Sequence, residues 1–332
     1  MDSVLTIDSK KTQKAFNILS IDGGGILGLY SAKILTLIEK EFFTKEETYA
    51  SKFDLIAGTS TGGIIALGLA LGRKACEIVS FYEKYGNQIF NKKWYTKLCW
   101  LITYRYPALP LCEALTEFFD NKKVKDCQTK ILIPAIDVSN CQPLIFKTDH
   151  NGSLTRDLNT KLVDIALATS AAPTYFPLYR FGNYRGLVDG GLWQNNPALF
   201  AVIEACTYFV GADKEYERIN VLSIGNPLSA IKETVSVEDR KSGLIKWMNK
   251  IVSVPMKISS LGTDDILSFI SRNKALFVEK YLRIESKNLA NKKEYKKLSL
   301  DYVSPRAYSM LSELSNHDFN KNKSDIIKFF KE

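Results

Sequence analysis

Short apolar runs alternate with helical patterns along the first two thirds of the chain. Each apolar run is short enough for one β-strand, and several are separated by helix-like stretches, which is typical of parallel strands covered on both faces. The pattern therefore predicts an α/β fold with a mostly parallel central sheet. The runs are FNILSI (16–21), FDLIAG (53–58), KILIPAI (130–136), PLIFKT (143–148), RGLVDG (185–190) and NVLSIG (220–225).

The pattern changes after about residue 228, where it becomes helical and rich in lysine. No internal repeat, low-complexity tract or Pro/Gly-rich linker separates this part from the rest. We expect a single domain over 1–332, with a core at about 14–228 and a mainly helical portion at about 229–332 packed on it.

Composition and charge narrow the class of protein. The chain has 332 residues, 45% of them hydrophobic, and 45 Lys and Arg against 36 Asp and Glu give a net charge of +9, which favours anionic partners such as phospholipid headgroups or nucleotides. The first 20 residues lack a signal-peptide apolar run, and no stretch is long enough to span a bilayer. Six scattered cysteines without a CxxC pair indicate reduced thiols. We expect a cytoplasmic protein.

A glycine motif follows the first predicted strand. Gly23, Gly24 and Gly25 precede a helical pattern, and Gly23, Gly25 and Gly28 have the G-x-G-x-x-G spacing of a dinucleotide site. The same backbone N–H groups could receive an oxyanion instead. A dinucleotide site needs an acidic residue at the end of the second strand, and that strand ends in GTS, at 58–60. The loop is therefore better interpreted as an oxyanion hole.

A second motif stands at the end of the next strand. Gly58, Ser60 and Gly62 form G-x-S-x-G before an apolar helix, which is the pattern of a nucleophile elbow. Small residues beside the serine suit the tight, strained turn that such an elbow requires. We expect Ser60 to stand on a rigid, buried support.

The residues alone leave two candidates for the base that activates Ser60. The chain contains two histidines, His150 and His317, and a triad of Ser60, Asp189 and His317 would follow the α/β-hydrolase order, although the motifs occur earlier in the strand order than in that fold. Asp189 also ends an apolar strand before two glycines and could act directly. Asp-Gly is a common turn as well, and Asn195 or Asn196 before Pro197 has the pattern of an ordinary helix N-cap.

The motifs together resemble one family. DGGGILG, GTSTG, ATSAAPTYFPLY and DGG, in this order, are similar to the patatin-like phospholipases over about residues 14–228. The resemblance implies a three-layer α/β/α fold and a lipid acyl hydrolase with a Ser60–Asp189 dyad, and it assigns the oxyanion-hole N–H groups to Gly23, Gly24 and Gly25. It implies no metal or cofactor. This chain has Leu27 where the family often has Arg or Lys, so no basic side chain is present at that position.

A narrower resemblance concerns regulation. LIFKTDH together with ALATSAAPTYFPLY and DGGLWQNNPA is similar to bacterial patatin-like effectors that cyclic nucleotides activate in antiphage signalling. The implied partners are a phospholipid membrane and a cyclic nucleotide, with no nucleic acid. Two alternatives stay open: an esterase with the His317 triad, and a nucleotide-binding module without hydrolytic activity.

Two segments have the composition of a membrane interface. Residues 84–112 contain five basic residues, no acid, and several aromatic side chains including Trp94 and Trp100. Residues 241–257 contain four lysines and no acid, with apolar residues at helical spacing. Core packing explains such patterns equally well, but we expect peripheral contact with the inner face of the membrane around Trp94 and Trp100.

Overall fold

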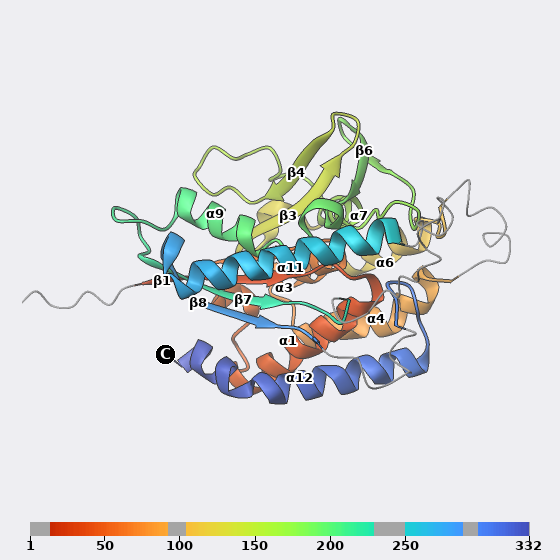
Figure 1. Cartoon of the computed structure of the whole chain (residues 1–332). Helices are drawn as coiled ribbons and strands as arrows, with labels where there is room; N and C mark the ends of the chain where they lie inside the picture. The colour runs from red at the N-terminus through yellow and green to blue at the C-terminus, as the bar shows by residue number, and fades with distance from the viewer. Residues whose placement is uncertain (1–13, 92–103, 229–249, 288–297, 332) are drawn as a thin grey trace, which may run out of the picture.

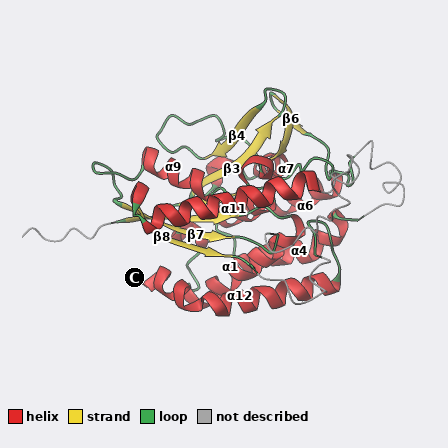
Figure 2. Ribbon diagram, viewed as in Figure 1, coloured by secondary structure: helices red, strands yellow, loops and turns green. Residues whose placement is uncertain are grey.

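The fold is a central sheet with helices on both faces (Figures 1 and 2). The computed structural model describes residues 14–91, 104–228, 250–287 and 298–331. Strands that are neighbours in the order β5-β6-β3-β2-β1-β7-β8 are hydrogen-bonded to each other. Strands β6 and β2 pair with different parts of one edge of β3, and β4 pairs with its other edge. Its strands are β1 (Ala15–Ile21), β2 (Leu55–Gly58), β3 (Lys130–Asp137), β4 (Gln142–Lys147), β5 (Tyr179–Phe181), β6 (Tyr184–Asp189), β7 (Arg218–Ile224) and β8 (Val278–Ile284).

The helices occupy the two outer layers. Helices α1, α3, α4, α6, α7 and α12 contribute to one apolar core, and α9 with the second half of α11 contributes to the other. The helices are α1 (Gly28–Phe42), α2 (Tyr49–Lys52), α3 (Thr61–Ala70), α4 (Ala75–Ile89), α6 (Leu109–Phe119), α7 (Leu162–Thr169), α8 (Gly191–Gln194), α9 (Ala198–Tyr208), α11 (Lys250–Arg272) and α12 (Pro305–Lys331), with short 3-10 turns at Gly25–Leu27, Val124–Asp126 and Ala275–Phe277.

Alternation along the central strands divides the two cores. In β1, Leu19 and Ile21 face the α1 layer, whereas Phe16 and Ile18 face the α9 layer. Because both faces are covered, the strand is apolar throughout, and this explains why the apolar runs identified strands so directly. All six strands expected from those runs are present.

The C-terminal portion is mainly helical in its described residues, as expected, and it also contributes a strand. Helices α11 and α12 are present, but β8 extends the sheet by pairing in parallel with β7. The sequence of β8, VEKYLRI, was not recognised as a strand because three of its seven residues are charged and interrupt the apolar run. Charged residues are common in a strand at a sheet edge. The portion after residue 228 is therefore also part of the sheet. The five described cysteines form no disulfide.

Strands β2 and β6 end next to each other along one edge of β3. Strand β2 runs parallel to β3 and pairs with its first residues, with Ala57 opposite Leu132. Strand β6 runs antiparallel and pairs with the last residues, with Asp189 opposite Ala135. Since β4 occupies the other edge along 132–137, β2 and β6 share the same edge and their carboxyl ends point toward each other. The residues that follow β2 and end β6 must therefore meet.

Candidate active site

Ser60 lies in the tight turn between β2 and α3. Its backbone has φ 55 and ψ −128, a conformation that costs a non-glycine residue about 1–3 kcal/mol. The turn leaves no room at Gly62, where an added Cβ would lie 2.4 Å from the Ile21 carbonyl oxygen. The Ser60 N–H donates to Thr169 Oγ1 at 3.0 Å. The expected nucleophile-elbow geometry is thus present, on a helix buried from Gly62 to Ala70.

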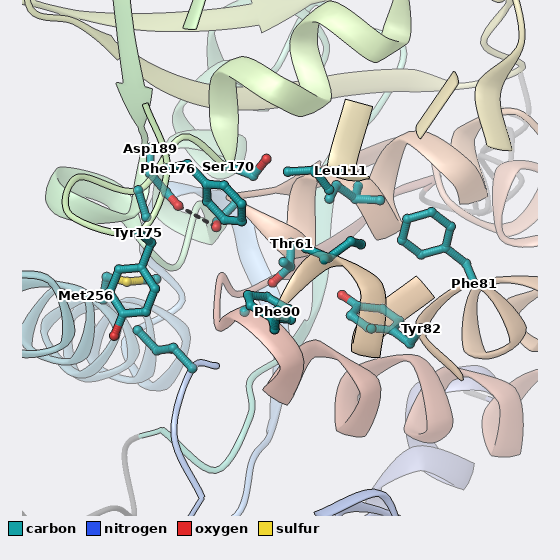
Figure 3. A pocket seen from close by; sticks show the side chains of 17 residues that line it. Thr61, Phe81, Tyr82, Phe90, Leu111, Ser170, Tyr175, Phe176, Asp189 and Met256 are labelled. Atoms are coloured by element: carbon teal, nitrogen blue, oxygen red, sulfur yellow. Dashed lines mark hydrogen bonds between the residues drawn. The ribbon is translucent and has the colours of Figure 1, made fainter. Parts of the chain in front are cut away.

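Asp189 ends β6 and contacts the serine. The Ser60 hydroxyl donates to Asp189 Oδ2 at 2.5 Å, which is the dashed line in Figure 3. The Gly191 N–H donates to Asp189 Oδ1 at 2.7 Å. Asp189 is 1% exposed and Ser60 4%. Burial raises the pKa of Asp189 from 3.8 to about 7, against the lowering effect of these two hydrogen bonds. The carboxyl group can therefore take up and release a proton near neutral pH.

The three glycines differ in what their N–H groups contact. The Gly23 N–H donates to the Asn195 carbonyl oxygen at 3.2 Å, and the Gly24 N–H donates to Thr61 Oγ1 at 3.2 Å. Within the described residues, no acceptor is found for the Gly25 N–H, and Gly25 lines the same pocket as Ser60. Gly25 has φ +57, which favours glycine. Gly25 thus has the N–H best placed to receive a ligand oxygen, whereas that of Gly23 is engaged within the protein.

An apolar pocket leads away from the serine. Asp189 stands at one end and Phe81, Tyr82 and Leu111 stand at the other (Figure 3). Such a lining suits hydrocarbon rather than a charged cofactor. The lining residues are Gly25, Ser60, Thr61, Ile64, Phe81, Tyr82, Gly86, Ile89, Phe90, Leu111, Ser170, Ala172, Tyr175, Phe176, Asp189, Met256 and Leu300.

Neither histidine belongs to this pocket. His317 lies on α12 with 71% of its side chain exposed and its Nδ1 3.0 Å from Asp318 Oδ1. His150 is buried, with contacts to Glu204 at 2.7 Å and Thr148 at 3.0 Å. The structure therefore brings Ser60 and Asp189 together without His317, and the triad alternative lacks its geometry.

The sequence missed the role of Asn195. We expected Asn195 or Asn196 to cap the following helix, and Asn196 Oδ1 does accept the Ala198 N–H at 3.1 Å. Asn195 instead donates from Nδ2 to the Gly23 carbonyl oxygen at 3.1 Å. Leu27, the departure from the family pattern, is buried in the core next to the glycine loop.

The membrane-interface expectation is only partly visible. Trp94 and Trp100 lie outside the described residues. In the second segment, Ile251 is 48% exposed whereas Met256 is buried and lines the pocket. Among the described helices, none is long and apolar enough to cross a bilayer. The described residues also contain no His, Cys, Asp and Glu cluster suited to a metal ion.

Comparison with known proteins identifies the family. Residues 19–202 match the family model described as patatin-like phospholipase, and the chain belongs to this family. It is 35% identical over 306 residues to a "cGAMP-activated phospholipase" of Pseudomonas aeruginosa, covering 91% of this chain and 87% of that protein. It is 31% identical over 338 residues to a protein of the same name from Vibrio cholerae, covering 95% and 94%.

A plant protein is also similar. Patatin-like protein 1 of Arabidopsis thaliana is 32% identical over 309 residues, covering 82% of this chain and 74% of that protein. The predicted family, the patatin fold class and the enzyme class, a lipid acyl hydrolase, are confirmed. The roles of individual residues stay predictions.

The raised pKa of Asp189 predicts an unusual effect on stability. Because the folded-state pKa, about 7, exceeds the unfolded value of 3.8, protonation of Asp189 stabilises the fold below pH 4 and this contribution is lost as pH rises through 7. At pH 8 the ionised group destabilises the fold by as much as ~4 kcal/mol. We expect Asp189→Asn to unfold at a higher temperature than the wild type at pH 8, with the advantage shrinking toward pH 5.

The matched control is Asp137→Asn. Asp137 is also buried, but its carboxylate accepts three hydrogen bonds, one more than that of Asp189, from the Ser139 N–H, the Asn140 N–H and Asn140 Nδ2, so this variant should be less stable than the wild type at pH 8. Thermal unfolding measured at pH 5 and pH 8 gives both comparisons. An Asp189→Asn protein less stable than the wild type at pH 8 would contradict the expected burial cost.

Proposed function

We propose that the chain hydrolyses fatty-acyl esters of phospholipids through a Ser60–Asp189 dyad and that a cyclic nucleotide of the cGAMP class activates it. The observation that carries the proposal is the 2.5 Å hydrogen bond from Ser60 Oγ to Asp189 Oδ2 at the end of an apolar pocket. Family membership supports the reaction class.

The proposed reaction begins with proton transfer from Ser60 Oγ to Asp189 while Oγ attacks the ester carbonyl carbon. The carbonyl oxygen becomes an oxyanion, which the N–H groups of Gly24 and Gly25 stabilise, with the Gly24 N–H exchanging Thr61 Oγ1 for the oxyanion. The tetrahedral adduct then expels the lipid alcohol, which takes the proton from Asp189. An acyl group remains on Ser60.

Water completes the cycle. Asp189 accepts a proton from a water molecule that attacks the acyl carbon, and the collapse of the second adduct returns a proton to Ser60 Oγ and releases the fatty acid. Asp189 suits both steps because burial raises its pKa to about 7, which makes it a stronger base than an exposed carboxylate. The acyl chain would occupy the apolar pocket between Ser60 and Phe81.

Activation and location form the second part of the proposal. Three similar bacterial proteins are named cGAMP-activated phospholipases, at 31–37% identity. A cyclic nucleotide and a membrane phospholipid are both accessible at the inner face of the cytoplasmic membrane, so we place the enzyme there, in contact with lipid around Trp94 and Trp100. A part in antiphage signalling stays a prediction.

Replacing either member of the dyad should abolish hydrolysis. We expect Ser60→Ala and Asp189→Asn to release fatty acid from mixed phospholipid vesicles at least ~1,000-fold more slowly than the wild type, because nucleophile and base act as a unit. His317→Ala should stay within about threefold of the wild type, since its side chain is exposed and contacts Asp318.

The matched control is Ser170→Ala. Ser170 lines the same pocket, but its hydroxyl donates to the Ala166 carbonyl oxygen at 2.6 Å, so the variant should remain active. Far-UV circular dichroism checks the fold of each protein. A loss of several orders of magnitude in His317→Ala would favour the triad, and nucleotide binding without any hydrolysis by the wild type would favour a binding module.

The dyad also predicts a pH dependence. Because Asp189 must be ionised to accept the serine proton, kcat/KM for a soluble ester should rise about tenfold per pH unit below about 7 and level off above it. The measurement is initial rate from pH 5 to pH 9 with p-nitrophenyl butyrate. A rate that is constant from pH 5.5 to pH 8 would exclude Asp189 as the base.

Nucleotide activation is tested by titration. We expect cGAMP to bind, with heat detectable by isothermal calorimetry, and to raise the rate of fatty-acid release at least tenfold. A panel of other cyclic dinucleotides serves as the specificity control. Hydrolysis that is fast without nucleotide and unchanged by any of them would indicate a constitutive enzyme and refute this part of the proposal.

A further inference from the structure

Helix α11 contacts both loops of the catalytic site, although it lies outside the residues that match the family model. Two consecutive serines make these contacts. Ser259 Oγ donates to the Trp193 carbonyl oxygen at 3.1 Å and accepts the Asn195 N–H at 3.0 Å, in the loop that follows Asp189. Ser260 reaches the glycine loop as well. Helix α11 thus links the loop after β6 to the loop after β1.

The Ser260 hydroxyl occupies a buried position between two polar side chains. It donates to Asp22 Oδ2 at 2.8 Å and accepts from Asn195 Nδ2 at 2.9 Å. Ser260 is 5% exposed, Asp22 2% and Asn195 1%, so water cannot replace these contacts at low cost. One hydroxyl therefore satisfies an acceptor and a donor at once.

Asp22 is the residue immediately before the three glycines, and it is held from the other side by β8. Arg283 forms two hydrogen bonds with its carboxylate, from Nη1 to Oδ1 at 2.7 Å and from Nη2 to Oδ2 at 2.5 Å. This paired geometry fixes the plane of the carboxylate. The start of the glycine loop is thus anchored to α11 through Ser260 and to β8 through Arg283.

Asn195 transmits the contact to the loop itself. The side-chain Nδ2 of Asn195 donates to Ser260 Oγ and also to the Gly23 carbonyl oxygen at 3.1 Å. The backbone carbonyl oxygen of Asn195 accepts the Gly23 N–H at 3.2 Å. The peptide group that carries the Gly23 carbonyl also carries the Gly24 N–H. Orientation of this peptide therefore sets the direction of a proposed oxyanion donor.

We propose that Ser260 is a positioning residue that orients the Gly23–Gly24 peptide toward the oxyanion. The inference rests on the proposed function. Loss of the hydroxyl would leave Asp22 with one contact fewer and Asn195 Nδ2 with one of its two hydrogen bonds, the one to the Gly23 carbonyl oxygen. The N–H groups of the glycine loop would then point less accurately at an oxygen that becomes charged only in the transition state. Such a defect lowers kcat and leaves KM nearly unchanged.

The test compares Ser260→Ala and Ser260→Thr with the wild type, each saturated with cGAMP. Active sites are counted in one sample by complete labelling of Ser60 with a fluorophosphonate, and kcat and KM are measured with p-nitrophenyl butyrate on an unlabelled sample of the same protein. We expect kcat per labelled site to fall at least about tenfold in Ser260→Ala with KM within threefold, and Ser260→Thr to retain kcat because it keeps the hydroxyl. Should Ser260→Ala yield no labelled protein, Ser260→Cys, which keeps the volume and weakens both bonds, should show the same fall.

The matched control is Ser315→Ala on α12. Ser315 is equally buried, but its hydroxyl donates to the Ser312 carbonyl oxygen in its own helix at 2.8 Å, so kcat per labelled site should not change even if stability falls. A kcat per labelled site in Ser260→Ala within threefold of the wild type overturns the inference, as does an equal fall in the alanine and threonine variants. A wild type that neither labels nor hydrolyses ester refutes the proposed function itself, and this inference with it.

Discussion

The hydrogen bond between Ser60 and Asp189 depends on how three strands meet. Strands β2 and β6 run in opposite directions along one edge of β3, and each covers only part of it. If β6 paired along the whole of β3, its last residue would lie beside the first residue of β3, past the end of β2. The offset pairing places Asp189 opposite Ala135, with Asp189 Oδ2 2.5 Å from Ser60 Oγ. The mixed character of the sheet is therefore a requirement of the site.

The apolar surroundings of Ser60 and Asp189 have two effects. They favour hydrocarbon in the pocket, and they raise the pKa of Asp189 to about 7, where the carboxylate is basic enough to share a proton with serine. The site also carries two local costs to stability, since an ionised carboxylate is buried and Ser60 is held at a positive φ. The two packed cores on either side of the sheet supply the stabilisation that offsets these local costs.

The sequence predicted those features that depend on local patterns. Apolar runs located six strands, and the G-x-S-x-G and glycine motifs located both loops, because a strained turn permits few residue types. Strand β8 was missed because its charges obscure the strand pattern. No sequence motif around Asn195, Ser260 or Arg283 indicated the contacts that these residues make. Ser260 and Arg283 lie 238 and 261 residues from Asp22, and only the folded chain brings them to it.

The order of the catalytic elements along the chain determines when the active site can be completed during synthesis. The nucleophile elbow is made early, Asp189 follows well over a hundred residues later, and α11 and β8 come later still, before α12. Parallel pairing between β8 and β7 requires nearly the whole chain to have left the ribosome. A nascent chain thus carries Ser60 for much of its synthesis without the anchors of the glycine loop. The catalytic site of this phospholipase is therefore completed late in synthesis, when α11 and β8 have been made.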